Sequence, residues 1–411
     1  MEPDPREVRA PEERERALMK ALPAVVAHVF ARAPGYRRRD PGVVPEEVTS
    51  RAALARLRLL RKSELPELQR ADPPFGGLST VAAPQAAKLY SSPGPVFELE
   101  PRTADPWRAS RALRAAGFRS GDVVHNSFSY HLTPAGSMVE TAAHALGCAV
   151  IPAGTAPTEA QALAAAQFRA TAYGGTPSFL KILLDRAAEL RLDVSSLTRA
   201  SVTAEALPAA LRKGLAERGV QVLQWYGTAD AGLIAYETPA LEGLVVDEDV
   251  ILEIVRPGTG DPVPEGEVGE VVVTIVSGDH PLLRFATGDL SAILPGPSPC
   301  GRTNLRIRGW MGRADQSTKV RGLFVHPSHV AELVRRHPEV KRARVVVTRP
   351  ADLDVMLLRA EVGPAERAAR LGEALAGTLK EVTQLRGEVE LVEVGSLPND
   401  GKVIDDQRPV G

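Results

Sequence analysis

Short apolar runs alternate with alanine-rich helical stretches through the middle of the chain, and this alternation limits the possible folds more than any other feature. The apolar runs lie at 123–124, 149–151, 170–173, 200–202 and 220–223. The stretches with the spacing of amphipathic helices lie at 137–147, 158–168 and 177–191. Because each strand is followed by a helix, the pattern predicts an α/β domain with a largely parallel sheet.

The segments on either side of this region have other patterns. Residues 12–33 and 50–60 place leucine and valine at helical spacing, which predicts two packing helices. From about Gly243 the helical pattern stops, and Pro/Gly turns separate short runs rich in Val and Ile. These runs lie at 250–255, 269–276 and 291–294. They predict a small β-barrel or twisted sheet that is appended to the α/β part.

The residues after Asp315 predict a small α+β domain. Helices are expected at 328–336, with Ser328 as the N-cap, and at 364–382. Strands are expected at 343–348, 353–362 and 388–394. Since 411 residues exceed what one core commonly organises, we expect a large N-terminal domain over 1–314 and a small C-terminal domain over 315–411.

Charge and cysteine content exclude several classes of protein. The 50 Lys and Arg residues are balanced by 51 Asp and Glu residues, so no strong positive field draws the chain to nucleic acid. Cys148 and Cys300 lie far apart and form neither a disulfide pattern nor a zinc-binding pattern. The N-terminus is charged, and no apolar run approaches the roughly 20 residues of a membrane helix. We therefore expect a cytoplasmic protein with no nucleic-acid or membrane partner.

Residues 226–230, Tyr-Gly-Thr-Ala-Asp, follow a short apolar run and so lie at the carboxyl end of a strand. Ligands collect at this end in open α/β sheets. The Tyr226 ring can stack on a base, Gly227 permits close backbone approach, and the Thr228 hydroxyl can donate to a phosphate. Asp230 supplies the oxygen ligands that Mg²⁺ prefers. A plain strand-to-loop turn is the alternative interpretation of this segment taken alone.

Three further motifs follow, at Arg284–Asp289, Gly312–Gly322 and Pro398–Lys402. Thr287 and Gly288 are expected to form a turn that presents Asp289, whose carboxylate can accept charge-assisted hydrogen bonds from two ribose hydroxyls. Arg313 can contact a phosphate or a ribose. Each motif has an alternative interpretation: an ordinary turn acid for Asp289, a solvated charged hairpin for Gly312–Gly322, and a surface lysine for Lys402.

The four motifs in this order resemble those of AMP-forming acyl-adenylate synthetases, and especially the phenylacetate–CoA ligase branch. The resemblance runs from roughly residue 12 to residue 405. It implies a ligase that uses ATP, Mg²⁺ and coenzyme A on a small carboxylic acid. It also implies that the C-terminal domain is a mobile lid and that the protein forms a homodimer.

The resemblance assigns roles to residues of the nucleotide site. The residues that would surround the nucleotide base are Thr203, Ala204, Glu205, Tyr226, Gly227 and Thr228. Asp289 would hold the ribose, Arg313 would contact the nucleotide, and Asp230 would bind the metal ion. Lys402 would enter the site during adenylation and act there as a catalytic residue together with Thr228, where negative charge accumulates in the transition state.

Other roles concern the domain movement and the acid. Asp315 would be the hinge between the two domains, and Gly322 would lie against the arm of coenzyme A. The acid pocket would contain Phe128, Tyr130 and His131. His131 is expected to be a pocket or packing residue rather than a catalytic base.

The chain departs from the family in its phosphate-binding loop. The family has the form Ser-Ser-Gly-Thr-Thr-Gly-x-Pro, whose N–H groups and hydroxyls cradle the β- and γ-phosphates. Residues 91–98 read Ser-Ser-Pro-Gly-Pro-Val-Phe-Glu instead. Two prolines remove backbone donors, and Glu98 adds a negative charge. Several lost hydrogen bonds, each worth about 1.5–3 kcal/mol, predict weaker ATP binding and leave adenylate binding to the other motifs.

Two alternatives to an acid–CoA ligase stay open at this point. One is an adenylating enzyme that passes the acyl group to an amine or a carrier protein, which CoA-independent AMP release would reveal. The other is a non-catalytic adenylate-binding protein, which needs neither Asp289, Arg313 nor Lys402. The expectation that the acid is small and aromatic or hydroxylated comes from the resemblance alone.

Overall fold

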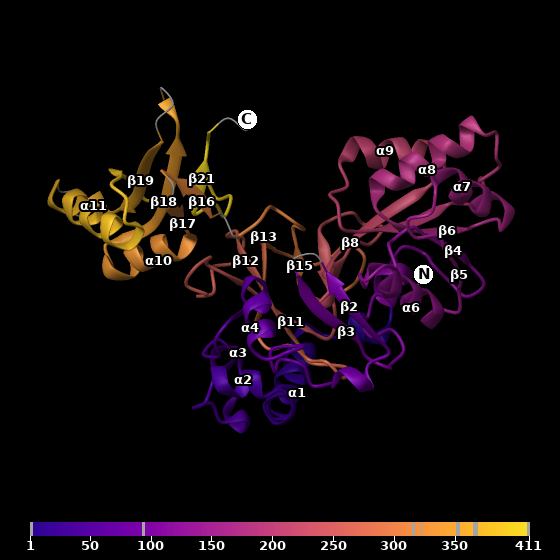
Figure 1. Ribbon diagram of the computed structural model, residues 1–411, viewed down its shortest axis with the longest axis horizontal. Helices are drawn as coiled ribbons and strands as arrows, with labels where there is room; N and C mark the ends of the chain where they lie inside the picture. The colour runs from indigo at the N-terminus through magenta and orange to yellow at the C-terminus, as the bar shows by residue number, and fades with distance from the viewer. Residues whose placement is uncertain are drawn as a thin grey trace. The chain divides into compact units, whose positions relative to one another are not determined.

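The region in which strand and helix alternate contributes to a sheet of nine strands within the described residues (Figure 1). The strand order of this sheet is β14-β15-β10-β9-β8-β7-β6-β4-β5. Its strands are β4 (Val123–Asn126), β5 (Ala149–Pro152), β6 (Ala172–Gly175), β7 (Arg199–Val202), β8 (Gln221–Thr228), β9 (Gly232–Tyr236), β10 (Leu244–Val246), β14 (Ile293–Leu294) and β15 (Arg306–Ile307). From β5 to β8 all neighbours are parallel, which confirms the predicted α/β sheet. β9, β10 and β15 extend it with antiparallel pairs.

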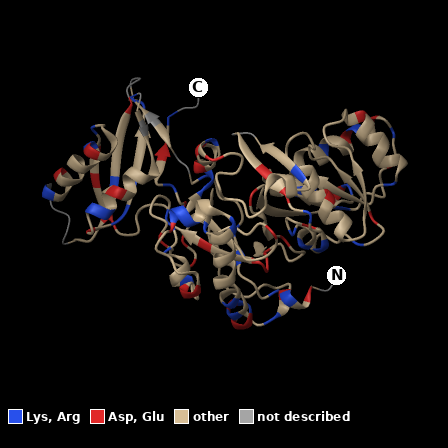
Figure 2. Ribbon diagram, turned by 60° about the horizontal axis from the view of Figure 1, so that its bottom comes forward, with Lys and Arg blue, Asp and Glu red and all other residues tan. Residues whose placement is uncertain are grey.

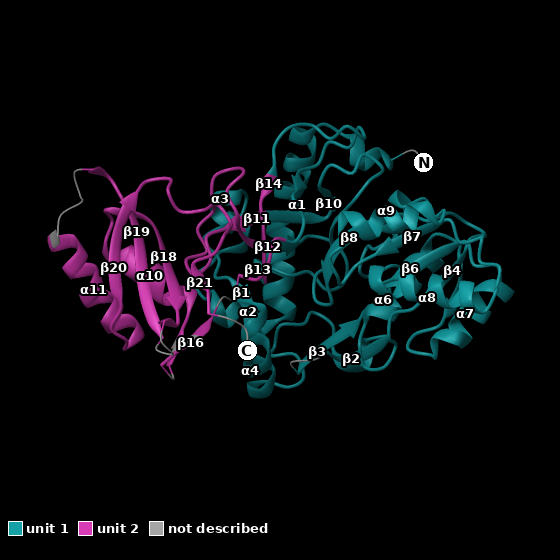
Figure 3. Cartoon of the chain, turned by 90° about the horizontal axis from the view of Figure 1, so that it is seen from above, with its two compact units in different colours: residues 1–252, 273–287, 294–310 teal, residues 253–272, 288–293, 311–411 magenta. Residues whose placement is uncertain are grey.

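The computed structural model describes residues 3–92, 95–314, 317–321, 323–350, 354–364 and 369–408. Its internal contacts divide the chain into two units (Figure 3). Unit 1 comprises Met1–Leu252, Val273–Thr287 and Leu294–Trp310, and unit 2 comprises Glu253–Val272, Gly288–Ile293 and Met311–Gly411. Asp315 and Gly322 lie outside the described residues, so their roles stay predictions, as does the domain boundary at 314.

Helices cover the parallel strands on both faces, as a sheet of this kind requires. They are α6 (Ala135–Ala145), α7 (Thr158–Gln167), α8 (Pro177–Glu189) and α9 (Ala209–Glu217). Figure 1 shows α8 and α9 on one side of these strands and α6 on the other. α8 begins where its sequence predicts, because the Thr176 hydroxyl accepts from the Phe179 N–H at 3.3 Å and Pro177 occupies the first turn. Its buried Leu180 and Leu183 pack with Tyr173 and Val202 of the sheet.

The N-terminal part of unit 1 is helical, with one exception to the prediction. α1 (Pro11–Arg32) is confirmed and buries its predicted apolar face. The helix predicted over 50–60 is wrong, since the structure has only one helical turn, α3 (Arg51–Leu54), and a short strand, β1 (Leu60–Arg61). The Arg284 guanidinium donates hydrogen bonds to the carbonyl oxygens of Ala55 and Leu57 at 2.6 and 2.7 Å. A continuing helix would use these carbonyls as acceptors for its own backbone N–H groups.

Part of the strand-only region forms a second sheet, with the order β1-β13-β12-β11, whereas β10, β14 and β15 of this region join the nine-stranded sheet. The further strands of the second sheet are β11 (Val250–Val255), β12 (Gly269–Ile275) and β13 (Phe285–Ser291). Within the described residues this order ends at β1 and β11, which makes an open sheet. The boundary between the two units falls within β11, β12, β13 and β14.

The C-terminal part of unit 2 is the predicted α+β fold. Its sheet has the order β20-β19-β18-β21, and a hairpin of β16 and β17 precedes it. The elements are β16 (Thr318–Val320), β17 (Leu323–Val325), α10 (Pro327–Arg336), β18 (Val340–Thr348), β19 (Val355–Val362), α11 (Ala369–Thr383), β20 (Glu388–Glu393) and β21 (Ile404–Asp406). The predicted N-cap Ser328 is wrong, because Pro327 already occupies the first helical position and His326 is the N-cap.

A hairpin of β2 (Lys88–Ser92) and β3 (Val96–Glu100) occupies the place of the altered phosphate loop. The remaining short helices are η1 (Pro5–Val8), α2 (Pro34–Arg39), η2 (Pro45–Glu47), η3 (Lys62–Glu64), α4 (Leu65–Ala71), η4 (Ala83–Gln85) and α5 (Ser110–Ala115). Figure 2 shows basic and acidic residues mixed along both units. In the part of the chain that is described, no helix is both long and apolar enough to cross a bilayer.

Candidate functional site

The turn between β8 and β9 carries the Tyr-Gly-Thr-Ala-Asp motif and is held rigidly in unit 1. The Thr228 hydroxyl accepts from the Ala231 N–H at 3.0 Å, and the Trp107 indole donates to the Ala229 carbonyl at 3.0 Å. Gly232 has a φ of 67°, and a Cβ there would lie 2.7 Å from the Trp107 carbonyl oxygen. This turn therefore has a fixed shape, which presents Asp230 at the strand end.

The predicted base-side residues lie at the ends of β7 and β8. The Thr203 hydroxyl donates to the Trp225 carbonyl at 2.7 Å, which ties the two strand ends together. Tyr226 is buried, and its hydroxyl donates to Thr287 at 3.0 Å. Ala204 has a φ of 70°, a strained conformation for a residue with a Cβ. Glu205 is exposed and accepts from the Ser178 N–H at 3.4 Å. Their roles in nucleotide binding stay predictions.

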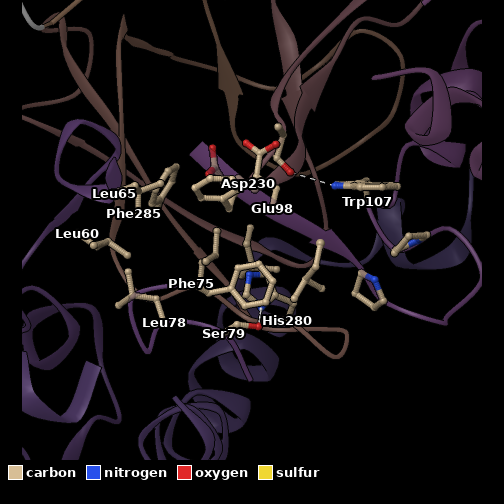
Figure 4. A pocket seen from close by; sticks show the side chains of 18 of the residues that line it. Leu60, Leu65, Phe75, Leu78, Ser79, Glu98, Trp107, Asp230, His280 and Phe285 are labelled. Atoms are coloured by element: carbon tan, nitrogen blue, oxygen red, sulfur yellow. Dashed lines mark hydrogen bonds between the residues drawn. The ribbon is translucent and has the colours of Figure 1, made fainter. Parts of the chain in front are cut away.

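A pocket in unit 1 lies beside this turn (Figure 4). Most of its wall is apolar, from Leu60, Leu65, Phe75, Leu78, Phe97, Leu99, Trp107 and Phe285. Two carboxylates line it, those of Glu98 on β3 and Asp230 on the turn, and Figure 4 shows them next to each other on one side. The hairpin that replaces the phosphate loop thus contributes directly to the pocket wall.

The charged groups at this pocket include the two carboxylates, Lys62, which pairs with Asp230, and the Arg108 guanidinium, which pairs with Asp247 at 3.2 Å. Lys62 donates to Asp230 Oδ2 at 2.7 Å. Glu98 is 8% exposed, and its Oε2 accepts from the Ser92 hydroxyl at 2.5 Å. Its Oε1 is buried and has no hydrogen-bond partner in the described part of the chain. Burial, and secondly the nearby Asp230 carboxylate, raise the pKa of Glu98 to about 7.

His280 belongs to the same pocket wall and carries no charge at neutral pH. Burial lowers its pKa to about 4, although the Asp230 carboxylate acts in the opposite direction. The Ser79 hydroxyl lies 3.5 Å from its Nδ1. The imidazole therefore does not compensate the negative charge of the two carboxylates.

In unit 2, Asp289 and Arg313 contact each other, and their predicted roles toward the nucleotide stay predictions. Arg313 donates to Asp289 Oδ1 at 3.1 Å, and their backbones form an antiparallel bridge. The expected turn at Thr287 and Gly288 is wrong, since both lie within β13. Gly288 has a φ of 76°, and a Cβ there would lie 2.8 Å from an Arg313 guanidinium nitrogen. Glycine is favoured here by the positive φ, and a Cβ would also displace the guanidinium.

The turn that carries Lys402 is also anchored within unit 2. The Asn399 side chain accepts from the Val268 N–H at 3.1 Å, and Arg344 forms an ion pair with Asp400. Gly401 has a φ of 69°, and a Cβ there would lie 2.6 Å from Val268 and 3.1 Å from Leu290.

The Lys402 turn therefore packs against β13 at Leu290, the residue next to Asp289. Lys402 itself is about half exposed, and its ammonium donates to Asp405 at 3.0 Å. Such an exposed contact is weak, so the ammonium can leave it for a stronger anionic ligand.

The predicted acid-pocket residues differ in their surroundings, and none lines the pocket beside Asp230. Phe128 is buried in an apolar cluster with Leu113 and Val139. The Tyr130 hydroxyl accepts from Asn126 at 2.7 Å, and burial raises its pKa. His131 is exposed, and its backbone N–H donates to the Ser129 hydroxyl at 3.1 Å. Their role in acid binding stays a prediction.

The residue types present fit a magnesium ion that arrives with a phosphate ligand. The described residues contain no group of three or more His, Cys, Asp or Glu side chains that could hold a metal ion alone. Mg²⁺ is usually held in proteins by one or two carboxylates together with substrate phosphates and water. Asp230 would provide one such carboxylate, and Glu98, whose Oε1 has no partner among the described residues, would provide another beside it.

Sequence reasoning did not identify Lys62, Trp107 or His280 as site residues. No local pattern marks them, because their partners lie far away in the chain. Lys62 and Asp230, for example, are separated by 168 positions. The inward orientation of Glu98 did have a signal, since Val96, Glu98 and Glu100 alternate along β3 and share one face.

Comparison with known proteins gives two matching family models and several similar full-length proteins. A model described as AMP-binding enzyme matches residues 107–277, and a model of the AMP-binding enzyme C-terminal domain matches residues 322–408. Phenylacetate-coenzyme A ligase of Thermus thermophilus is 33% identical over 371 residues, which are 86% of this chain and 82% of that protein. The enzyme of the same name from Aromatoleum evansii is 29% identical over 393 residues, 91% of this chain and 88% of that protein.

A solved structure supports the same fold. It is 2-hydroxyisobutyryl-CoA ligase in the postadenylation state in complex with 2-HIB-AMP. The TM-score is 0.71 at 25% identity, and the match covers 99% of this chain and 94% of that chain.

Proposed function

The chain belongs to the phenylacetate–coenzyme A ligase family of AMP-forming enzymes, and on this premise we propose that it joins a small aromatic or hydroxylated carboxylic acid to coenzyme A. As a member of this family it is an acyl-CoA ligase that acts through an acyl-adenylate. The class of acid is inferred from relatives that act on phenylacetate and 2-hydroxyisobutyrate.

The observation that carries this proposal is the packing of the Lys402 turn on β13 in unit 2. The strand bears Asp289, which would hold the ribose, and Arg313 lies on Asp289. A lysine that is delivered to the same strand can meet the acid carboxylate and the α-phosphate of a nucleotide bound there. A scaffold protein would need none of these three side chains in this arrangement.

The proposed reaction has two steps. A carboxylate oxygen of the acid attacks the α-phosphorus of ATP, the bond to the leaving pyrophosphate breaks, and the acyl-adenylate forms. The sulfur of coenzyme A then attacks the acyl carbon, AMP leaves with the bridging oxygen, and the thiol proton passes to solvent. Lys402 would stabilise the negative charge that develops in the first step, where a preorganised cation is most effective.

Several further assignments belong to the same proposal. Asp230 would hold Mg²⁺, which neutralises phosphate charge when it is bound. Asp315 would be the hinge that reorients residues 315–411 between the two steps, and Gly322 would then face coenzyme A. Hinges are commonly a few residues that absorb a large backbone rotation at the ends of elements. A homodimer remains the expected assembly.

The Lys402→Ala variant tests the proposed step assignment. It should lose acid-dependent ATP–pyrophosphate exchange by about 100-fold or more, the order expected for one charge-stabilising donor. It should still form the thioester from supplied acyl-adenylate and coenzyme A at a rate close to wild type. Equal loss of both half-reactions would show that Lys402 does not act in adenylation specifically.

A further inference from the structure

Glu98 occupies the strand that follows the altered phosphate loop, and it directs a carboxylate into the pocket. Its side chain is more than nine-tenths buried, and Oε1 has no hydrogen-bond partner among the described residues. A buried carboxylate oxygen without a partner is costly, so it indicates a ligand that the structure does not contain.

The surroundings of Glu98 favour a cation as that ligand. Asp230 lies beside it in the pocket, with its side chain 8% exposed, and Lys62 supplies the only cation that is paired with Asp230 in the described residues. Two carboxylates and one ammonium leave a net charge of −1 when all three are ionised. The Arg108 guanidinium also lines the pocket, but Asp247 pairs with it at 3.2 Å and balances its charge. The neutral His280 adds nothing to balance the remaining charge, and the rest of the wall is largely apolar.

We propose that Glu98 and Asp230 together bind the divalent cation that accompanies ATP, so that a metal-mediated contact replaces part of the lost phosphate loop. This inference rests on the proposed function, because it takes Asp230 as a metal ligand. The loop of the family binds phosphate through N–H and hydroxyl donors. In this chain a carboxylate on the next strand binds the metal ion instead, and the metal ion binds the phosphate oxygens.

The alternative occupant is an ammonium group of a small amine. An ammonium donates three hydrogen bonds and would satisfy Oε1 as well as a metal ion does. The two occupants differ in one respect, because only the metal ion couples Glu98 to nucleotide binding. The coupling is therefore the property to measure.

The experiment measures Mn²⁺ binding to the full-length enzyme by electron paramagnetic resonance, without nucleotide and with a non-hydrolysable ATP analogue. Wild type should bind one Mn²⁺, more tightly when the analogue is present. Glu98→Gln keeps the size of the side chain and should weaken Mn²⁺ binding at least about tenfold, as the loss of groups around a metal commonly does. Glu100→Gln, on the same strand and face, is the matched control and should bind Mn²⁺ as wild type does.

The outcomes separate this inference from the proposed function. If wild type binds the analogue with Mn²⁺ and Glu98→Gln binds Mn²⁺ within twofold of wild type, the role of Glu98 is refuted while the ligase function stands. If wild type binds neither Mn²⁺ nor the analogue, both are refuted. If Glu98→Gln does not fold by circular dichroism, Glu98→Asp carries the test, since its shorter carboxylate should also weaken Mn²⁺ binding.

Discussion

Replacing Glu98 by Gln should stabilise the metal-free protein at neutral and higher pH. The pKa of this carboxyl is raised from its ordinary value of 4.5 to about 7, first by burial and then by Asp230. In the folded protein it keeps its proton between these two pH values, whereas in the unfolded chain it loses the proton. The folded state therefore binds more protons in this window, and stability falls as the pH rises from 4.5 to 7.

The size of the effect follows from the same two pKa values. A tenfold change in proton affinity corresponds to about 1.4 kcal/mol, so ionising Glu98 in the fold costs about 3 kcal/mol at pH 8. At pH 5 most of this penalty is absent, and the expected difference is about 1 kcal/mol. Glu98→Gln removes the charge and keeps a hydrogen-bonding partner for Ser92. The variant should therefore exceed wild type by about 3 kcal/mol at pH 8 and by about 1 kcal/mol at pH 5.

Urea unfolding in a buffer with a chelator, at several pH values between 4.5 and 8.5, measures this difference. Glu100→Gln is the control, because its carboxylate accepts from Tyr90 and Ser137 at 2.5 and 2.6 Å. Removing that paired charge should destabilise the protein by about 1–3 kcal/mol at pH 8. A Glu98→Gln variant that is less stable than wild type at pH 8, or a difference that does not change with pH, would refute the electrostatic account of the pocket.

Three other substitutions test the packing of the site residues. Gly401→Ala places a Cβ 2.6 Å from Val268 at a positive φ, so urea unfolding should show a loss of about 1–3 kcal/mol, and ATP–pyrophosphate exchange should fall with it. Gly288→Ala pushes the Arg313 guanidinium away, so the affinity for AMP measured by calorimetry should fall. The control is Gly296→Ala, which should bind AMP as wild type does because a Cβ there meets nothing within 4 Å. Lys62→Met leaves Asp230 without its 2.7 Å partner and should cost about 1–3 kcal/mol in urea unfolding. Unchanged stability in Gly401→Ala or Lys62→Met, or unchanged AMP affinity in Gly288→Ala, would contradict the corresponding contact.

The order of strands and helices could be predicted from the sequence because local periodicity determines it. The runs around Val124, Tyr173 and Val202 become buried parallel strands, and the helices between them bury their apolar faces. Such patterns depend on which side of an element faces the core, and neighbouring residues record that directly.

The helix expected over 50–60 shows why other features could not be predicted. Leu54, Leu57 and Leu60 are all buried, so the apolar spacing is real. The carbonyls of Ala55 and Leu57 nevertheless accept hydrogen bonds from Arg284, which lies more than 200 positions away in the chain. A contact of that separation decides the backbone conformation, and no local pattern contains it.

The same limit applies to the candidate site. Asp289 and Arg313 were both singled out by their motifs, but their contact with each other was not predicted. The alternation along β3 indicates that Glu98 points inward, but the Lys62–Asp230 ion pair and the position of Glu98 beside Asp230 depend on how three separate segments fold together. The electrostatic character of the pocket is therefore visible only in the structure.

The central claim is that this chain adenylates a carboxylic acid and transfers the acyl group to coenzyme A, although its phosphate loop is altered. The direct measurement is AMP release from MgATP across a panel of aryl, aliphatic and hydroxylated acids, with and without coenzyme A. We predict release that requires both coenzyme A and a small aromatic or hydroxylated acid. Release with acid alone would show a different acyl acceptor, and absence of release with every acid in the panel, together with absence of MgATP binding, would contradict the claim.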